Sequence, residues 1–257
     1  MRPSADGALT VAPALRSRPR LRGWVHSAAA PAAVAAAVLL WDAASPGLSR
    51  ASVAVFGAGL VALFATSGIY HLPSWPDHVR RWLARVDVAM IQLFIAATFT
   101  PVAVHTLGGA WRTWSLVIAW AIALIGAGVA ASPLQGPRWL SVAAYASFAS
   151  LAAIPLLRVA EALSPAGIAL LGAGGLIYTV GGVIYARQGP NPWPAWFGFH
   201  EVFHVLVVLG SAAHAAAIWR YALPLAWAVL AVGMSVAAVV ADAAATYRGP
   251  CRQGSVR

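Results

Sequence analysis

The feature that most constrains the fold is a succession of long apolar segments joined by short polar connections. A helix needs about 20 apolar residues to cross a hydrocarbon core of about 30 Å, and each of these segments is long enough. The connections carry proline and glycine turn residues and leave no room for a separate soluble domain. The segments span residues 24–41, 51–72, 86–106, 114–132, 139–158, 166–186, 199–219 and 222–244.

The composition agrees with membrane insertion. Hydrophobic residues make up 61% of the 257 residues, charged residues only 9%, and the mean hydropathy is +0.76. A soluble domain carries roughly 25% charged residues, so most of the apolar side chains are expected to face lipid. The sequence therefore predicts an all-α, polytopic transmembrane helical bundle of seven core helices plus an eighth C-terminal helix.

The formal charge of +10 does not indicate nucleic acid as a partner. All 17 basic residues are arginines, and they occur in short clusters between apolar segments, as orientation signals do. The absence of lysine excludes a retinal Schiff base. Cys251 is the one cysteine, so there is no disulfide framework.

The arginines also predict the orientation. If the N-terminus is cytoplasmic and eight helices alternate, 13 arginines lie inside and four, Arg50, Arg112, Arg158 and Arg220, lie outside. The predicted domains are a disordered basic cytoplasmic arm (1–23), a seven-helix membrane domain (24–220), and an extra helix with a polar cytoplasmic tail (221–257). A signal peptide is the alternative for the first segment, but seven further segments favour an uncleaved helix.

Five polar residues lie near the ends of apolar segments. Ser67 and His71 are four apart at the end of the second, Asp87 opens the third, and His200 and His204 are four apart at the start of the seventh. A spacing of four places two side chains on one helix face. With a cytoplasmic N-terminus, all five fall at the cytoplasmic end, and ionisable groups within spans are functional candidates.

These residue types suit a zinc centre. Three imidazoles and a water form a catalytic arrangement, as opposed to a closed structural one. Asp87 could accept a proton from the water, and Ser67 could donate to the water or to a substrate carbonyl. The alternative to a metal site, for any one histidine in a membrane helix, is a hydrogen bond to a neighbouring helix. A carboxylate and a hydroxyl beside the histidines suit zinc better than haem.

A second interpretation uses the pattern His200-Glu201-Val202-Phe203-His204, which matches the H-E-x-x-H of zinc metalloproteases. Glu201 would be the general base of an intramembrane protease, and Asp242 a third ligand. That arrangement leaves Ser67, His71 and Asp87 without a role.

The remaining histidines have plainer expectations. His26 is expected to pack or to form a hydrogen bond, and His78 and His105 are expected to be solvated. His214 is expected to be a buried, hydrogen-bonded side chain, with a place in a substrate cavity as the alternative. In the sixth segment, Gly175 and Gly182, with Gly172 and Gly174 nearby, predict close packing on a neighbouring helix.

The combined motifs resemble those of the hemolysin III family, which is related to the progestin and adipoQ (adiponectin) receptors. The resemblance covers roughly residues 24–220. Bacterial members often have a histidine after the aspartate, where this chain has Val88, and the segment 222–244 exceeds a seven-helix plan. The residues that carry the resemblance are Ser67-x-x-x-His71, Asp87, Ile95–Pro101, Gly174–Gly181, His200-x-x-x-His204 and Val205–His214.

The resemblance implies a seven-helix integral membrane protein of the bacterial plasma membrane with a cytoplasmic N-terminus. It implies Zn²⁺ bound by His71, His200 and His204, and a water that contacts Asp87. Ser67 would lie next to the ligands without binding the zinc itself. Some animal relatives are linked to ceramide hydrolysis, and bacterial relatives are named for haemolysis. Membrane lipids are the expected partners, and a lipid amide the expected substrate. A non-catalytic receptor or pore-forming protein with a structural zinc is the alternative.

Overall fold

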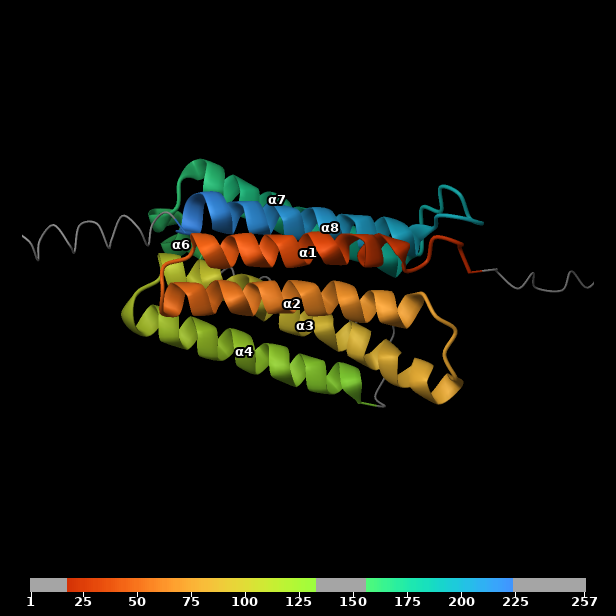
Figure 1. Ribbon diagram of the computed structural model, residues 1–257. Coiled ribbons are helices and arrows are strands. Elements are labelled where there is room, and N and C mark those ends of the chain that lie inside the picture. Colours follow the sequence, from red (N-terminus) through yellow and green to blue (C-terminus); the bar gives the residue numbers. More distant parts are fainter. Residues whose placement is uncertain (1–17, 133–155, 224–257) are drawn as a thin grey trace, which may run out of the picture.

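A computed structural model describes residues 18–132 and 156–223, and within these ranges the chain forms helices and no β-strand. The helices run side by side along a common direction (Figure 1). Most of the predicted 139–158 segment, nearly all of 222–244, and the C-terminal tail lie outside the described residues.

Six helices in the described residues are long and apolar enough to cross a membrane, which confirms a helical membrane bundle. The last of the six is α8 together with a short π-helical turn, η1. The elements are α1 (Trp24–Ala43), α2 (Leu48–His71), α3 (Asp77–Thr106), α4 (Gly109–Ala131), α6 (Leu156–Ala162), α7 (Pro165–Arg187), α8 (Phe199–Ala217) and η1 (Ile218–Ala222).

The start of α3 differs from the prediction, because the helix begins at Asp77, well before the apolar segment at 86. Pro76 precedes it, and the carboxylate of Asp77 lies in the first turn, where the helix dipole stabilises a negative charge. Hydropathy detects only the apolar part of such a helix. Asp87 therefore lies about three turns into α3 and does not open it, and His78 lies in the first turn of α3.

Neighbouring helices pack in the order α1–α2–α3–α4, and α7 packs on α8. Helix α1 also contacts α8, so it joins the two groups (Figure 1). Helix α3 is the most enclosed of these six helices. Of the residues in its apolar 18-residue stretch, 61% are buried, against 11% in α4. Large side chains such as Ile125 and Leu176 point outward, with 68% and 65% of their surface exposed, as lipid-facing residues do.

The close packing of α7 on α8 uses glycines one position away from the predicted pair. A Cβ added at Gly174 would lie 2.6 Å from the His214 ring, and one at Gly181 would lie 3.3 Å from Leu206. Added at Gly175, a Cβ would meet nothing within 4 Å among the described residues. The predicted close approach is therefore present, but Gly174 and Gly181 face α8.

One end of the bundle collects the elements that carry the candidate site residues. Helix α2 ends there, and α1, α3 and α8 begin there (Figure 1). The connection between α7 and α8 and residues 18–23 lie at the same end. Residues far apart in the sequence are thus placed at one level of the bundle.

Candidate metal centre

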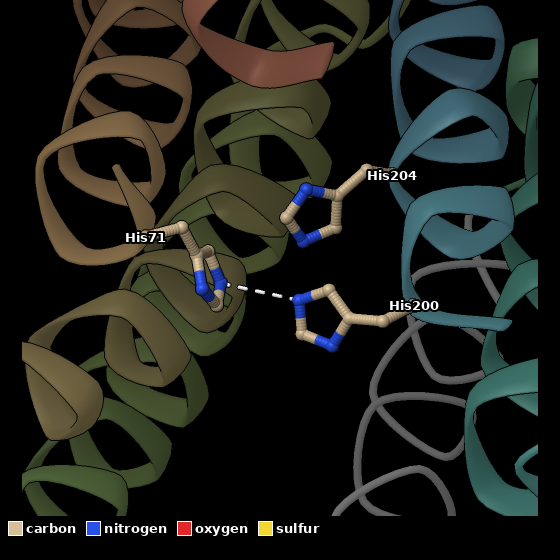
Figure 2. Close-up of side chains that lie close together, drawn as sticks. All are labelled: His71, His200 and His204. Atoms are coloured by element: carbon tan, nitrogen blue, oxygen red, sulfur yellow. Dashed lines mark hydrogen bonds between the residues drawn. The ribbon is translucent and has the colours of Figure 1, made fainter. Parts of the chain in front are cut away.

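Three histidines converge at this end of the bundle. His71 is the last residue of α2, and His200 and His204 lie in the first two turns of α8. One ring nitrogen from each lies within 4.8 Å of the others, and the Nε2 atoms of His71 and His200 are 3.1 Å apart (Figure 2). Nitrogens bound to one tetrahedral zinc at about 2.0–2.1 Å lie roughly 3.4 Å from each other. The three side chains therefore fit a single cation.

The spacing of four residues on α8 produces this arrangement locally. The His200 and His204 rings lie 4.4 Å apart between centroids because they share one helix face. The His71 ring faces both of them, at 4.7 and 5.2 Å. His71 and His204 are buried, and His200 is partly exposed. The pair from α8 and the single histidine from α2 thus form a largely buried site.

Asp87 and Ser67 add a carboxylate and a hydroxyl to the same site. The Oδ2 atom of Asp87 lies 3.6 Å from Nε2 of His71, and the Asp87 side chain remains 18% exposed. Ser67 lies one turn before His71 on α2, and its Oγ is buried without a hydrogen-bond partner among the described residues. An unpaired buried hydroxyl is costly unless a bound molecule satisfies it. The structure therefore brings together the five residues that the sequence singled out.

His26 from α1 supports the cluster from behind. Its ring stacks on His204 at 3.9 Å between centroids with an angle of 6°, and it lies 4.8 Å from the Phe64 ring. Both of its ring nitrogens are buried and have no partner in the described part of the chain. His26 thus takes the expected packing role, and the residue it packs on is a candidate ligand.

Comparison with known proteins identifies the family of this chain. The family model described as "Haemolysin-III related" matches residues 15–215. The chain belongs to this family. It is 29% identical over 172 residues to the monocyte to macrophage differentiation factor of Homo sapiens, covering 65% of this chain and 68% of that protein.

Two further relatives extend the comparison beyond animals. The hemolysin-3 homolog of Bacillus subtilis (strain 168) is 30% identical over 162 residues, covering 63% of this chain and 73% of that protein. The heptahelical transmembrane protein ADIPOR1 of Oryza sativa subsp. japonica is 30% identical over 183 residues, covering 63% of this chain and 48% of that protein. No solved structure matches.

In this haemolysin-III-related chain, Glu201 of the H-E-x-x-H pattern is engaged away from the histidines. Its side chain is 1% exposed, and one carboxylate oxygen forms an ion pair with Nε of Arg22. The other oxygen accepts a hydrogen bond of 2.8 Å from the backbone N–H of Gly198 and so caps α8. Both oxygens of the proposed protease base are thus occupied, and Asp242 lies outside the described residues.

Residues 18–23, here called the arm segment, lie over the centre. They belong to the arm that the sequence predicts to be disordered, but in the structure they form turns against the α7–α8 connection. Backbone N–H groups of Arg20 and Leu21 donate to the carbonyls of Ala195 and Trp196 at 3.0 and 3.1 Å. Residues 1–17 of the predicted arm lie outside the described residues.

The arm segment reaches His71 directly. The Arg18 guanidinium donates to the backbone carbonyl of His71 and lies 3.3 Å from its Nδ1. Gly23 has a φ of 88°, and a Cβ there would fall 2.7 Å from Cβ of His71. Only glycine allows this approach. Nothing in the sequence beyond the run of alternating arginines could have indicated these contacts of Arg18 and Arg22.

The other histidines lie apart from the centre. His214 donates from Nδ1 to the Gly210 carbonyl at 3.0 Å, which matches the expected hydrogen-bonded role, although it is half-buried. His78 is exposed, as expected. His105 was expected to be solvated, but it is half-buried, with Nε2 lying 3.4 Å from Oγ of Ser49.

Proposed function

We propose that this haemolysin-III-related protein binds one zinc ion through His71, His200 and His204 and hydrolyses an amide bond of a membrane lipid. The observation that carries the proposal is the convergence of three ring nitrogens within 4.8 Å, with a carboxylate oxygen 3.6 Å from one of them. Imidazole nitrogen is a preferred zinc ligand, and three protein ligands are the number found in catalytic sites.

The residues around the ligands suit hydrolysis. A zinc ion bound there would act as a Lewis acid and make a water molecule more acidic. Asp87 accepts the proton of the attacking water and passes it to the departing amine nitrogen, as the new C–O bond forms and the C–N bond breaks. The Ser67 hydroxyl, buried beside the ligands, donates to the carbonyl oxygen or holds the water.

The class of substrate follows from the family and from the place of the site. The centre lies at one end of an apolar bundle, where the polar group of a lipid would be found, and it is largely buried. The family resemblance to animal relatives linked to ceramide hydrolysis favours a lipid amide. The H-E-x-x-H protease finds less support, since both oxygens of Glu201 are already bound.

Metal analysis of the purified protein tests the centre. We expect about one zinc per chain, and His71→Ala, His200→Ala and His204→Ala should each lose most of it because each removes one of three ligands. His78→Ala is the matched control, since His78 is an exposed histidine at the same end of the bundle and should leave the zinc content unchanged. Full zinc retention in the His71 variant would contradict the proposed ligand set.

A hydrolysis assay with lipid amides tests the reaction separately. Asp87→Asn should keep its zinc and lose activity by roughly 10²–10⁴-fold, because a general base contributes about that much. Glu201→Gln, assayed per zinc-loaded protein, should retain most of the activity, whereas a protease would show the reverse pattern. Zinc binding with no hydrolysis of any lipid amide would leave a metal centre of a receptor or structural kind and would contradict the hydrolase.

A further inference from the structure

A cavity beside the metal centre has a basic lining. It has a volume of about 290 Å³ and opens outward next to the end of α2. Tyr70, the residue before His71, lines the cavity, and its ring is 4.3 Å from that of His71. The lining residues are Tyr70, Asp77, Arg80, Arg81 and Ala84.

Positive charge is concentrated at this cavity. Arg80 and Arg81 are exposed, and within the described ranges neither forms an ion pair. Asp77 supplies a carboxylate to the lining, which two guanidinium groups outnumber. Like charges held close together without partners repel each other, and an anion bound between them would relieve this repulsion.

The arm segment brings a third guanidinium group to this end. Arg18 reaches His71 from the arm segment, which the ion pair between Arg22 and the buried Glu201 holds in place. Burial, followed by the nearby charges of Arg22 and Arg80, lowers the pKa of Arg18. Arg18 therefore adds a positive charge to the end of the bundle that carries this cavity.

Exposed tryptophans place the cavity at the depth of lipid headgroups. Trp82 follows Arg81 on α3 and is 61% exposed, and Trp24 at the start of α1 is 57% exposed. On the α7–α8 connection at the same end, Trp193 and Trp196 are 67% and 51% exposed. Tryptophan is enriched where the hydrocarbon core meets the headgroups, so a ligand of this cavity is expected to be part of a lipid.

We infer that this cavity binds the phosphodiester headgroup of an anionic phospholipid. Arg80 and Arg81 contact the phosphate oxygens, for which guanidinium groups provide paired donors, and Arg18 adds charge from the arm segment. The Tyr70 hydroxyl is a further donor, and the Asp77 carboxylate accepts from a headgroup hydroxyl. The site does not depend on zinc, so it stands or falls separately from the proposed hydrolase.

Native mass spectrometry of the purified full chain, titrated with phosphatidylglycerol or phosphatidylcholine, tests the site. We expect phosphatidylglycerol to bind more tightly than phosphatidylcholine. Arg80→Gln and Arg81→Gln should each weaken phosphatidylglycerol binding by about five-fold, the effect of one juxtamembrane arginine on an anionic lipid surface. Both side chains are exposed, so these variants should fold normally.

Arg187→Gln is the matched control, because Arg187 is an exposed arginine at the end of α7, on the same side of the bundle and outside the cavity lining. It should leave phosphatidylglycerol binding unchanged. An equal loss in this variant would mean a general attraction to surface charge and overturn the site. Equal binding of phosphatidylcholine would overturn it as well, and displacement of the lipid by inorganic phosphate at a similar concentration would indicate a site for a soluble anion.

Discussion

At the scale of single residues, the histidines and the glutamate of the H-E-x-x-H pattern have different roles. His200 and His204 face His71, whereas Glu201 caps α8 and pairs with Arg22. Four residues along a helix return to the same face, but the second residue points about 100° away from the first. The pattern alone cannot tell a catalytic glutamate from one that holds a neighbouring segment.

The ion pair between Arg22 and Glu201 is expected to stabilise the folded protein. Arg22→Ala should lower the free energy of unfolding by about 3–5 kcal/mol, because it leaves a carboxylate that is 1% exposed without its partner. Thermal or denaturant unfolding in detergent would measure this. The double variant Arg22→Ala, Glu201→Gln should lose less stability than the sum of the losses in Arg22→Ala and Glu201→Gln, since the two residues share one interaction. Strict additivity would argue against the ion pair.

At the scale of helices, apolar segments and actual helices differ mainly at their polar ends. Helix α3 carries a polar stretch from Asp77 to Arg85 that hydropathy leaves out, and this stretch includes Arg80 and Arg81, which line the cavity beside the metal centre. Helix packing is also more specific than the glycine pattern suggests. Small residues permit close approach, but the rotation of α7 about its axis decides which of its glycines meet α8.

A pair of glycine variants on α7 tests that rotation. Gly174→Ala should destabilise the protein by about 1–3 kcal/mol, because the added methyl group would lie 2.6 Å from the His214 ring and force it to move. Gly172→Ala on the same helix should be neutral or stabilise by up to about 1 kcal/mol, since its Cβ would meet nothing within 4 Å among the described residues and alanine favours a helix. The unfolding midpoints of both variants test which glycines of α7 face α8, and equal effects would contradict the observed packing.

At the scale of the whole molecule, the candidate ligands meet because α2 ends where α3 and α8 begin (Figure 1). This alternation of direction is what a membrane imposes on helices joined by short loops. It places the candidate metal centre and the cavity lined by Arg80 and Arg81 at the same end of the bundle. The arginine bias predicts that this end faces the cytoplasm.

Reporter fusions test the orientation. Fusions at the N-terminus and in the connection at 73–76 should give a cytoplasmic signal, and fusions at 107–108 an external one, because 13 of the 17 arginines fall on the cytoplasmic side of this arrangement. A cytoplasmic signal at 107–108 would contradict it. A fusion after Arg248 tests the eighth helix: a cytoplasmic signal supports a crossing by 222–244, and an external signal excludes it.

The sequence by itself determined the fold class and the family, and it named the candidate residues of the centre. Long apolar segments must be helical in lipid, because their backbone groups have no water to bind, and this holds whatever the packing. The four-residue spacings of Ser67 with His71 and of His200 with His204 are local geometry. Their convergence with Asp87 follows from counting helices, without any knowledge of side-chain contacts.

Only the tertiary structure decided what each residue touches. The ion pair of Glu201 with Arg22, the stacking of His26 on His204, and the contact of Arg18 with His71 join residues that are 53 to 179 positions apart. Such contacts depend on the rotation and tilt of each helix, which many side chains set together. Hydropathy and spacing report the period of a helix and its direction across the membrane, but they do not report which neighbour a given face meets.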